Sequence, residues 1–516
     1  MKNKILYTGL ALIFLSSICS GQSDVKKNKK TFQQAERAFE RADYLTAFQL
    51  YKENLKFNAA DYTAAYKSGL SLFNINKTDT GALSYFNRAQ DQVPEAHFYI
   101  GRIHLLRGES EKALQEFRHF KNNNKEINIP NSEVDNYIRQ CEIAMTGERE
   151  KNFYTVKNVG NGINTKYPEY VPLIWNLNGS LIFTSRRSND KFPSLDPYGQ
   201  FYEDIYVAGR EGDGWLTPLL LGDSLNTATH DACVAFSADG TELIIYRTDE
   251  QQTGGDLYLT KYLNQSWSTP VKLGPEINSE YLETSACFSA YGNEIIFSSN
   301  RPGGLGGRDL YRVIKFMNGR FSLPVNLGPL INTAEDEDAP FLDKNDNTLY
   351  FSSRGHNSMG EYDIFKAAYN TNTNTWSDVE NMGQPVNSTN DDIYFIKQED
   401  ANRGYFTSRR EGGYGDADIY EVNFSESTKV IVYCKVNTDK SNDKPEDLTV
   451  TLYNLKTGKL EGSYSSNKEY KNVILLVTRN QPYEIRFESG SNKTTIRQDS
   501  FDEKNNELNI DLTRKQ

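Results

Sequence analysis

Ten acidic residues recur at fixed places in the middle of the chain, and they are its first candidates for chemistry. Five of them stand five residues after the Asn of a repeated Gly-x-x-apolar-Asn phrase, and five open a repeated Asp-apolar-aromatic phrase. Two carboxylates could act as the acid and base of a glycosidase if their environments differed. An acid that occurs in every copy at one spacing instead suits a bond that every copy needs, for example to a turn amide or an arginine. We predict a structural role for both sets, which are Glu169, Asp231, Glu283, Glu337 and Asp392, and Asp204, Asp256, Asp309, Asp363 and Asp418.

Other common signatures of catalysis and cofactor binding are missing from the sequence. It has no Gly-x-Ser-x-Gly turn, no Walker phosphate loop, no Cys-x-x-Cys and no His-Glu-x-x-His, and its five histidines are scattered. The formal net charge of -11 argues against a nucleic-acid partner, because phosphate binding needs a clustered basic surface. We therefore predict a protein that is not an enzyme and holds no cofactor and no metal ion.

The acids belong to a repeat that occurs five times between residues 153 and 424. Each copy also carries an apolar segment that ends in Phe-Ser/Thr-Ser-Arg or a near variant, followed by a Gly-rich loop. Short β-branched and aromatic segments at this spacing predict a four-stranded blade in each copy. The phrases resemble the PD40 or WD40-like repeats of TolB-type proteins, and the resemblance implies a β-propeller. Five copies predict five blades, although that family often has six.

The N-terminal end of this region is predicted to complete the last blade. The fifth copy ends at Phe424 without a linking strand of its own, and residues 153–159 match the missing strand. We expect this segment to pair with residues 418–424, which would join the two ends of the ring and remove both open edges.

Residues 31–148 have the alanine- and leucine-rich 3.6-residue pattern of helices. Gly101 is expected to let two helices approach closely, with Ala113 beneath the first helix and Phe117 in the groove between them. These small and large residues resemble the tetratricopeptide repeat, which implies an α-solenoid with a concave binding groove. An ordinary helical bundle is the alternative.

The two ends of the chain predict export and a further small domain. Residues 1–21 combine Lys2 and Lys4, a short apolar run and small residues, as in a secretory signal peptide, and no later run is apolar enough to span a membrane. Ile18 precedes Cys19 where a lipoprotein signal prefers Gly or Ala, which disfavours lipidation. Residues 428–516 read as strands of a small β-sandwich and resemble a carboxypeptidase-regulatory domain.

The domain order, helical array, propeller and small sandwich, resembles the periplasmic PorE-type proteins of Bacteroidota. That resemblance implies a scaffold at the outer membrane that binds protein partners, one of which could be an outer-membrane barrel, and serves type IX secretion or gliding. The family usually ends in an OmpA-like domain, which is absent before Gln516, so direct peptidoglycan binding is not expected. Two alternatives are an extracytoplasmic propeller that binds or cleaves glycans and a solute sensor with a pocket between propeller and sandwich.

The loop between Arg187 and Asp204 is the predicted contact with a partner, because it is much longer than the corresponding loop between Arg301 and Asp309. Aromatic side chains on a loop stiffened by prolines suit a binding hot spot. The alternative is that the rings fold back and pack on the propeller or on the helical array. The aromatic residues concerned are Phe192, Tyr198, Phe201 and Tyr202.

Overall fold

The computed structural model describes residues 27–512, apart from short gaps. The gaps are 78–79, 124–127, 147–153, 197–198, 213, 223, 250–253, 290, 344–346, 371, 399–401, 425–428, 438–447, 466–471, 480, 491 and 502–505. The chain divides into two compact units, Met1–Asn423 and Phe424–Gln516. The predicted signal peptide, including Cys19, lies outside the described residues. Among the residues that are described, no helix is long and apolar enough to cross a membrane.

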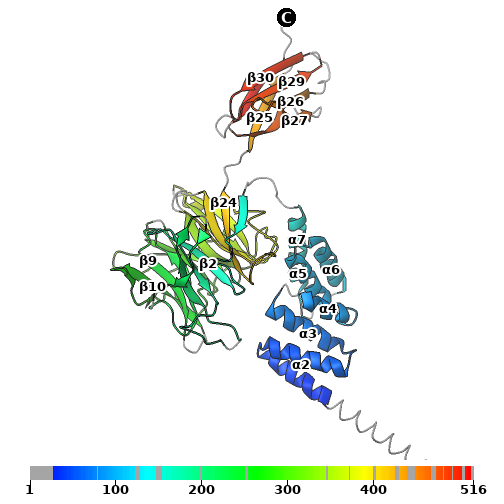
Figure 1. The fold of residues 1–516 in the computed structure, drawn as a ribbon, viewed down its shortest axis with the longest axis vertical. Helices are drawn as coiled ribbons and strands as arrows, with labels where there is room; N and C mark the ends of the chain where they lie inside the picture. The colour runs from blue at the N-terminus through cyan, green and yellow to red at the C-terminus, as the bar shows by residue number, and fades with distance from the viewer. Residues whose placement is uncertain are drawn as a thin grey trace, which may run out of the picture. The chain divides into compact units, whose positions relative to one another are not determined.

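The first unit begins with helices that stack one after another (Figure 1). Residues 27–40 are helical and precede α2 (Tyr44–Phe57), α3 (Tyr62–Ile75), α4 (Thr80–Ala89), α5 (Glu95–Leu106), α6 (Ser110–Asn123) and α7 (Asn131–Thr146). The predicted close approach at Gly101 is present, since a Cβ there would lie 2.8 Å from the Phe117 ring. Gly69 meets Phe86 in the same way at 2.8 Å, so the helix pairs α3–α4 and α5–α6 share one packing contact.

Five antiparallel sheets follow, each built around three main strands in chain order. Their first strands are β2 (Glu169–Trp175), β8 (Asp231–Phe236), β13 (Ala286–Phe288), β17 (Glu337–Asp343) and β22 (Asp392–Lys397). The second are β3 (Ser180–Ser185), β9 (Glu242–Thr248), β14 (Glu294–Ser299), β18 (Thr348–Ser353) and β23 (Arg403–Ser408). The third are β4 (Asp204–Ala208), β10 (Gly255–Leu263), β15 (Asp309–Ile314), β19 (Asp363–Asn370) and β24 (Asp418–Phe424).

Short linking strands complete the sheets on the outside. They are β7 (Leu219–Leu220), β11 (Ser266–Trp267), β12 (Val271–Lys272), β16 (Val325–Asn326), β20 (Thr375–Trp376) and β21 (Glu380–Asn381). A separate small hairpin joins β5 (Arg210–Glu211) and β6 (Gly214–Trp215). Each first strand contacts the first strands of two other sheets, in the cyclic order β2, β8, β13, β17, β22 and back to β2. We call these five the inner strands.

The fifth sheet takes its outer strand from the N-terminal end of the region. Strand β1 (Tyr154–Asn158) pairs with β24, next to which it lies in Figure 1. The Val159 backbone N–H extends the pairing by donating to the Ile419 carbonyl at 3.2 Å. The predicted pairing of this segment with residues 418–424 is confirmed.

The second unit consists of two sheets with an apolar core between them. One sheet joins β28 (Asn472–Thr478), β25 (Lys429–Asn437) and β31 (Glu507–Asp511), and the other joins β27 (Leu460–Ser465), β26 (Leu448–Asn454), β29 (Tyr483–Ser489) and β30 (Asn492–Gln498). Alternate residues of both sheets, such as Val432, Leu475, Val450 and Ile485, are fully buried. The unit contains strands at β27, β30 and β31 that the sequence did not reveal, because those segments hold few apolar residues.

Candidate functional site

Each acid of the first repeated set closes the turn before its own strand. Glu169 accepts bonds from the Thr165 backbone N–H at 2.6 Å and from its hydroxyl at 2.8 Å. Sequence reasoning missed the Thr or Ser that stands four residues before every acid, although its spacing is constant. The same two bonds recur in all five sheets and favour a structural role for Glu169, Asp231, Glu283, Glu337 and Asp392.

Four of these acids also pair with an arginine of the same sheet. The pairs are Arg187 with Glu169, Arg247 with Asp231, Arg301 with Glu283 and Arg410 with Asp392. In the fourth sheet, Gly355 and His356 occupy the corresponding positions, and His356 Nε2 bonds to the Ile331 carbonyl at 2.9 Å. Burial raises the pKa of Glu337 to about 7.

The second repeated set ties the loop after the second strand to the linking strand. Asp309 accepts bonds from the Leu305 backbone N–H at 2.7 Å and from the Asn326 amide at 2.6 Å. Asp363 and Asp418 form corresponding bonds. Burial raises the pKa of Asp363 to about 7. The remaining members differ, since Asp204 accepts a bond from Asn189 and Asp256 pairs with Lys272.

The repeated Asn residues link each sheet to the next. Asn332 accepts from the Leu310 N–H at 2.8 Å and donates to the Leu310 carbonyl at 3.0 Å, which replaces one rung of a sheet ladder between neighbours. Asn164 makes the same pair of bonds to Ile419 of the fifth sheet. The linkage therefore runs from the fifth sheet to the first as well as between consecutive sheets, through Asn164, Asn226, Asn278, Asn332 and Asn387.

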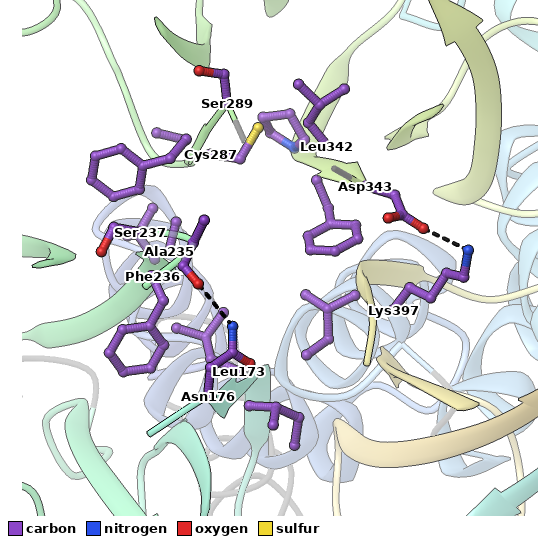
Figure 2. A pocket seen from close by; sticks show the side chains of 18 of the residues that line it. Leu173, Asn176, Ala235, Phe236, Ser237, Cys287, Ser289, Leu342, Asp343 and Lys397 are labelled. Carbon is purple, nitrogen blue, oxygen red and sulfur yellow. Dashed lines mark hydrogen bonds and ion pairs between the residues drawn. The ribbon is translucent and has the colours of Figure 1, made fainter. Parts of the chain in front are cut away.

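Cavities that share lining residues lie between the inner strands, and together we call them the channel. Its far end is a cavity of about 110 Å³, where each inner strand contributes side chains, among them Leu173, Ala235, Cys287, Leu342 and Lys397 (Figure 2). An adjoining chamber of about 190 Å³ shares Leu173 with the far end and is also lined by residues nearer the helical array. The chamber is bordered by Tyr170, Glu203 and Tyr394.

These three residues also line the mouth of the channel, a polar cavity of about 520 Å³. Arginines and acids from several sheets surround it, and they pair with one another. Arg308 Nη1 lies 2.6 Å from Asp338, and Arg409 pairs with Asp416 and, at 3.3 Å, with Asp391. Arg409 belongs to the repeated Phe-Ser/Thr-Ser-Arg phrase, whereas the positions of Arg308 and Asp338 hold other residue types in the other sheets.

The helical array covers part of the mouth and leaves a cleft of about 950 Å³ at its side. Residues Ile75–Lys77, at the C-terminal end of α3, line both the cleft and the mouth, and Leu106 of α5 lines the cleft. From the sheets, the cleft is lined by the loop before β4 and the loop before β24. Two apolar side chains of these loops, Leu195 and Tyr414, are 51% and 52% exposed.

Glu361 fastens the array to the fourth sheet. It is 6% exposed and bonds to Arg102 of α5 and, at 2.6 Å, to Arg354 of its own sheet. Lys77 lies 3.9 Å away. Burial alone would raise the pKa of Glu361, but Arg102, Arg354 and Lys77 lower it to about 2. A second bond joins the Asn390 amide to the Leu106 carbonyl of the array at 2.6 Å.

The predicted aromatic loop borders this cleft. Phe201 lines the cleft, is half-buried, and packs edge-on against Tyr167 with ring centroids 5.7 Å apart. Tyr202 is buried and packs against His230 at 4.9 Å, whereas Phe192 is half-buried. Tyr198 lies outside the described residues. The loop therefore has one ring folded inward and one at the edge of the cleft.

Comparison with known proteins gives similarity to solved structures only. No protein-family model matches the chain, and no curated protein matches it in sequence. Among solved structures it is similar to TolB from Acinetobacter baumannii, with 14% identity, a TM-score of 0.29, and coverage of 58% of this chain and 71% of that one. A putative TolB from Agrobacterium tumefaciens has 16% identity and a TM-score of 0.27, with coverage of 48% and 70%.

An enzyme is also among the similar structures. The α-L-arabinanase of Penicillium chrysogenum, complexed with arabinobiose, has 11% identity and a TM-score of 0.33, and the match covers 53% of this chain and 99% of that one. Because the similar structures include both TolB proteins and an enzyme, they do not decide whether this chain catalyses a reaction.

Proposed function

We propose that the chain is a non-catalytic scaffold of the cell envelope that binds a polypeptide segment of a protein partner in the cleft between the array and the sheets. In this proposal the five sheets are the blades of a closed five-bladed propeller, and the helices form a tetratricopeptide-type array. The unit Phe424–Gln516 is a carboxypeptidase-regulatory-like domain. The domain order suggests an exported, periplasmic protein that serves type IX secretion or gliding from the outer membrane.

The cleft of about 950 Å³ is the observation that carries the proposal. It combines half-exposed apolar side chains with polar groups from two kinds of element, a mixture that suits an extended polypeptide. The acids of the first repeated set, in contrast, accept bonds from the turns of their own sheets, and four of the five also pair with an arginine.

The experiment compares capture of partners from crosslinked envelopes by the unmodified chain and by cleft variants. Tyr414→Ser and Leu195→Ser are expected to lose capture at least about tenfold while the thermal midpoint stays unchanged, since both side chains are half-exposed. Tyr291→Ser is the matched control, because Tyr291 is 92% exposed and lies outside the cleft. Equal capture by all three variants would exclude the cleft as the binding site.

A glycan-binding or glycan-cleaving propeller is a second candidate, favoured by two unlike acids near the mouth. Burial and the nearby Glu361 carboxylate raise the pKa of Asp391, whereas the pKa of Glu361 is about 2. Acid–base hydrolysis requires one carboxyl group with a raised pKa and a second with a lowered pKa. Hydrolysis of arabinan or xylan by the purified chain, lost in Asp391→Asn, would establish this candidate and overturn the scaffold proposal.

A further inference from the structure

The chamber inside the channel differs from the mouth in its chemistry. Of its described lining residues, Glu203 alone has a charged side chain, and most of the others are apolar. Burial alone would raise the pKa of Glu203, but bonds from His230 and Tyr170 and the nearby Arg186 charge lower it. The side chain is 21% exposed, and His230 Nδ1 lies 3.4 Å from it. Among the described residues, no lysine or arginine nitrogen lies within 4.0 Å of this carboxylate.

Tyrosines form the other notable part of the wall. Tyr170 and Tyr394 lie with ring centroids 6.4 Å apart and planes inclined by 26°, and Tyr246 lines the same chamber. The face of an aromatic ring carries partial negative charge and attracts cations, most strongly where water is excluded. Three tyrosines beside one carboxylate therefore create a small region that favours positive charge and apolar contact together.

The backbone around this chamber is held in an uncommon conformation. Val171, Ala339 and Tyr394 have positive φ angles of 51°, 50° and 59°, and each stands two residues after the repeated acid of its sheet. Each lies within a register shift of its inner strand. A left-handed backbone is costly for a β-branched or bulky residue and is found where a site needs it. All three residues line the chamber.

We propose that the chamber binds an alkylammonium group, with Glu203 as the counter-charge and Tyr170, Tyr246 and Tyr394 as aromatic contacts. Two sources share this chemistry. One is a lysine side chain or terminal amine of a polypeptide seated in the cleft, and the other is a free small amine. The volume of about 190 Å³ accommodates an ammonium head and a short apolar stem. The proposal stands independently of the scaffold role, because amine binding is measured without any protein partner.

The first test is isothermal titration of the full chain with choline chloride and with 3,3-dimethyl-1-butanol, its neutral isostere. The two probes have nearly the same shape, so a difference in affinity reports the positive charge. We expect choline to bind at least about tenfold more tightly than the alcohol. Equal affinity for the two probes, or no binding of choline and of n-butylammonium, would overturn the proposal.

Variants test whether Glu203 supplies the counter-charge and whether the Tyr394 ring contacts the ligand. Glu203→Gln is expected to weaken choline binding at least about tenfold, and Glu380→Gln, an exposed acid on an outer strand, is expected to leave it unchanged. Tyr394→Phe keeps the ring face and Tyr394→Leu removes it at the same backbone conformation, so only the second should lose affinity. Unchanged affinity in Glu203→Gln, or equal loss in both Tyr394 variants, would contradict the assignment.

An N-terminally acetylated pentapeptide Ala-Gly-Lys-Gly-Ala and its form with an acetylated lysine side chain distinguish the two sources. If the partner's lysine is the ligand, the peptide binds more tightly than n-butylammonium, and the gain disappears in Tyr414→Ser. If a free amine is the ligand, n-butylammonium binds at least as tightly as the peptide. In both cases acetylation must abolish peptide binding, and acetylated peptide that binds as well as the unmodified one would refute the ammonium site.

Discussion

Glu337 differs from the other acids of its set, because no lysine or arginine of the described residues pairs with it. Its oxygens accept three bonds, two from Thr333 and one from Ser353 at 2.7 Å, and the side chain is fully buried. Burial raises its pKa to about 7. Glu283, at the same position of the preceding sheet, faces Arg301, which is 11% exposed. The two residues form a matched pair for mutation.

We predict that Glu283→Gln lowers the free energy of unfolding by at least about 2 kcal/mol, because Arg301 is left buried without an acid. Glu337→Gln is expected to change it by less than about 1 kcal/mol at pH 7, because no buried cation is left behind. Chemical denaturation of both variants and the unmodified chain measures the difference. Equal destabilisation by both would show that the arginine contributes nothing.

The raised pKa of Glu337 also predicts a pH dependence. Ionisation costs more in the folded than in the unfolded state, so the unmodified chain loses stability as pH rises from about 4.5 to about 7. Glu337→Gln lacks this loss, and its stability relative to the unmodified chain should therefore rise over that window. A constant difference between pH 4.5 and pH 8 would contradict the assignment.

At the scale of elements, the buried cluster around Glu361 holds the array to the fourth sheet. Arg102 reaches it from α5, and Tyr137 of α7 donates a bond of 3.4 Å. Loss of the Glu361 charge would leave Arg102 and Arg354 with no buried acid between them. The cleft exists only while the array stays in place, so this cluster positions the proposed binding site.

We predict that Glu361→Gln increases hydrogen exchange of α5 and α7 at least about tenfold, with little change in β17–β19, because the array dissociates locally. Glu411→Gln is the control, because Glu411 also pairs with the array, at 3.5 Å from Arg107, but is 61% exposed. The pKa of Glu361 is depressed to about 2, so the stabilisation is present above about pH 4.5 and is lost as pH falls toward 2. Unchanged exchange in the variant would place the attachment elsewhere.

Strand β1 is the second element whose place matters, because it covers the outer edge of β24. Asn158 donates to Asp418 at 2.8 Å and accepts from the Gly160 N–H at 2.8 Å. We predict that Asn158→Ala lowers the thermal midpoint and promotes aggregation, since an exposed edge strand recruits other chains. Lys157→Ala, at an exposed neighbouring position, should do neither, and equal aggregation of both variants would contradict the role of the Asn158 bonds.

At the scale of the whole molecule, the repeats made much of the fold predictable. The ten acids, the Asn residues and the segment before residue 160 were visible because they recur at constant spacing. The cleft and the Glu361 cluster were not, since they arise where α3 and α5 meet loops several hundred residues later. The chamber escaped notice for a similar reason, because Tyr170 and Glu203 come from the first sheet and Tyr394 from the fifth, far apart in the sequence.

The central claim is that a polypeptide binds in the cleft, and site-specific photocrosslinking in living cells tests it most directly. Benzoylphenylalanine placed at Tyr414 is within the cleft, and at Tyr291 it is on an exposed turn outside it. The account predicts a discrete protein adduct from position 414 and none from position 291. Adducts from position 291 alone, or no protein adduct from position 414 or from Leu195, would contradict it.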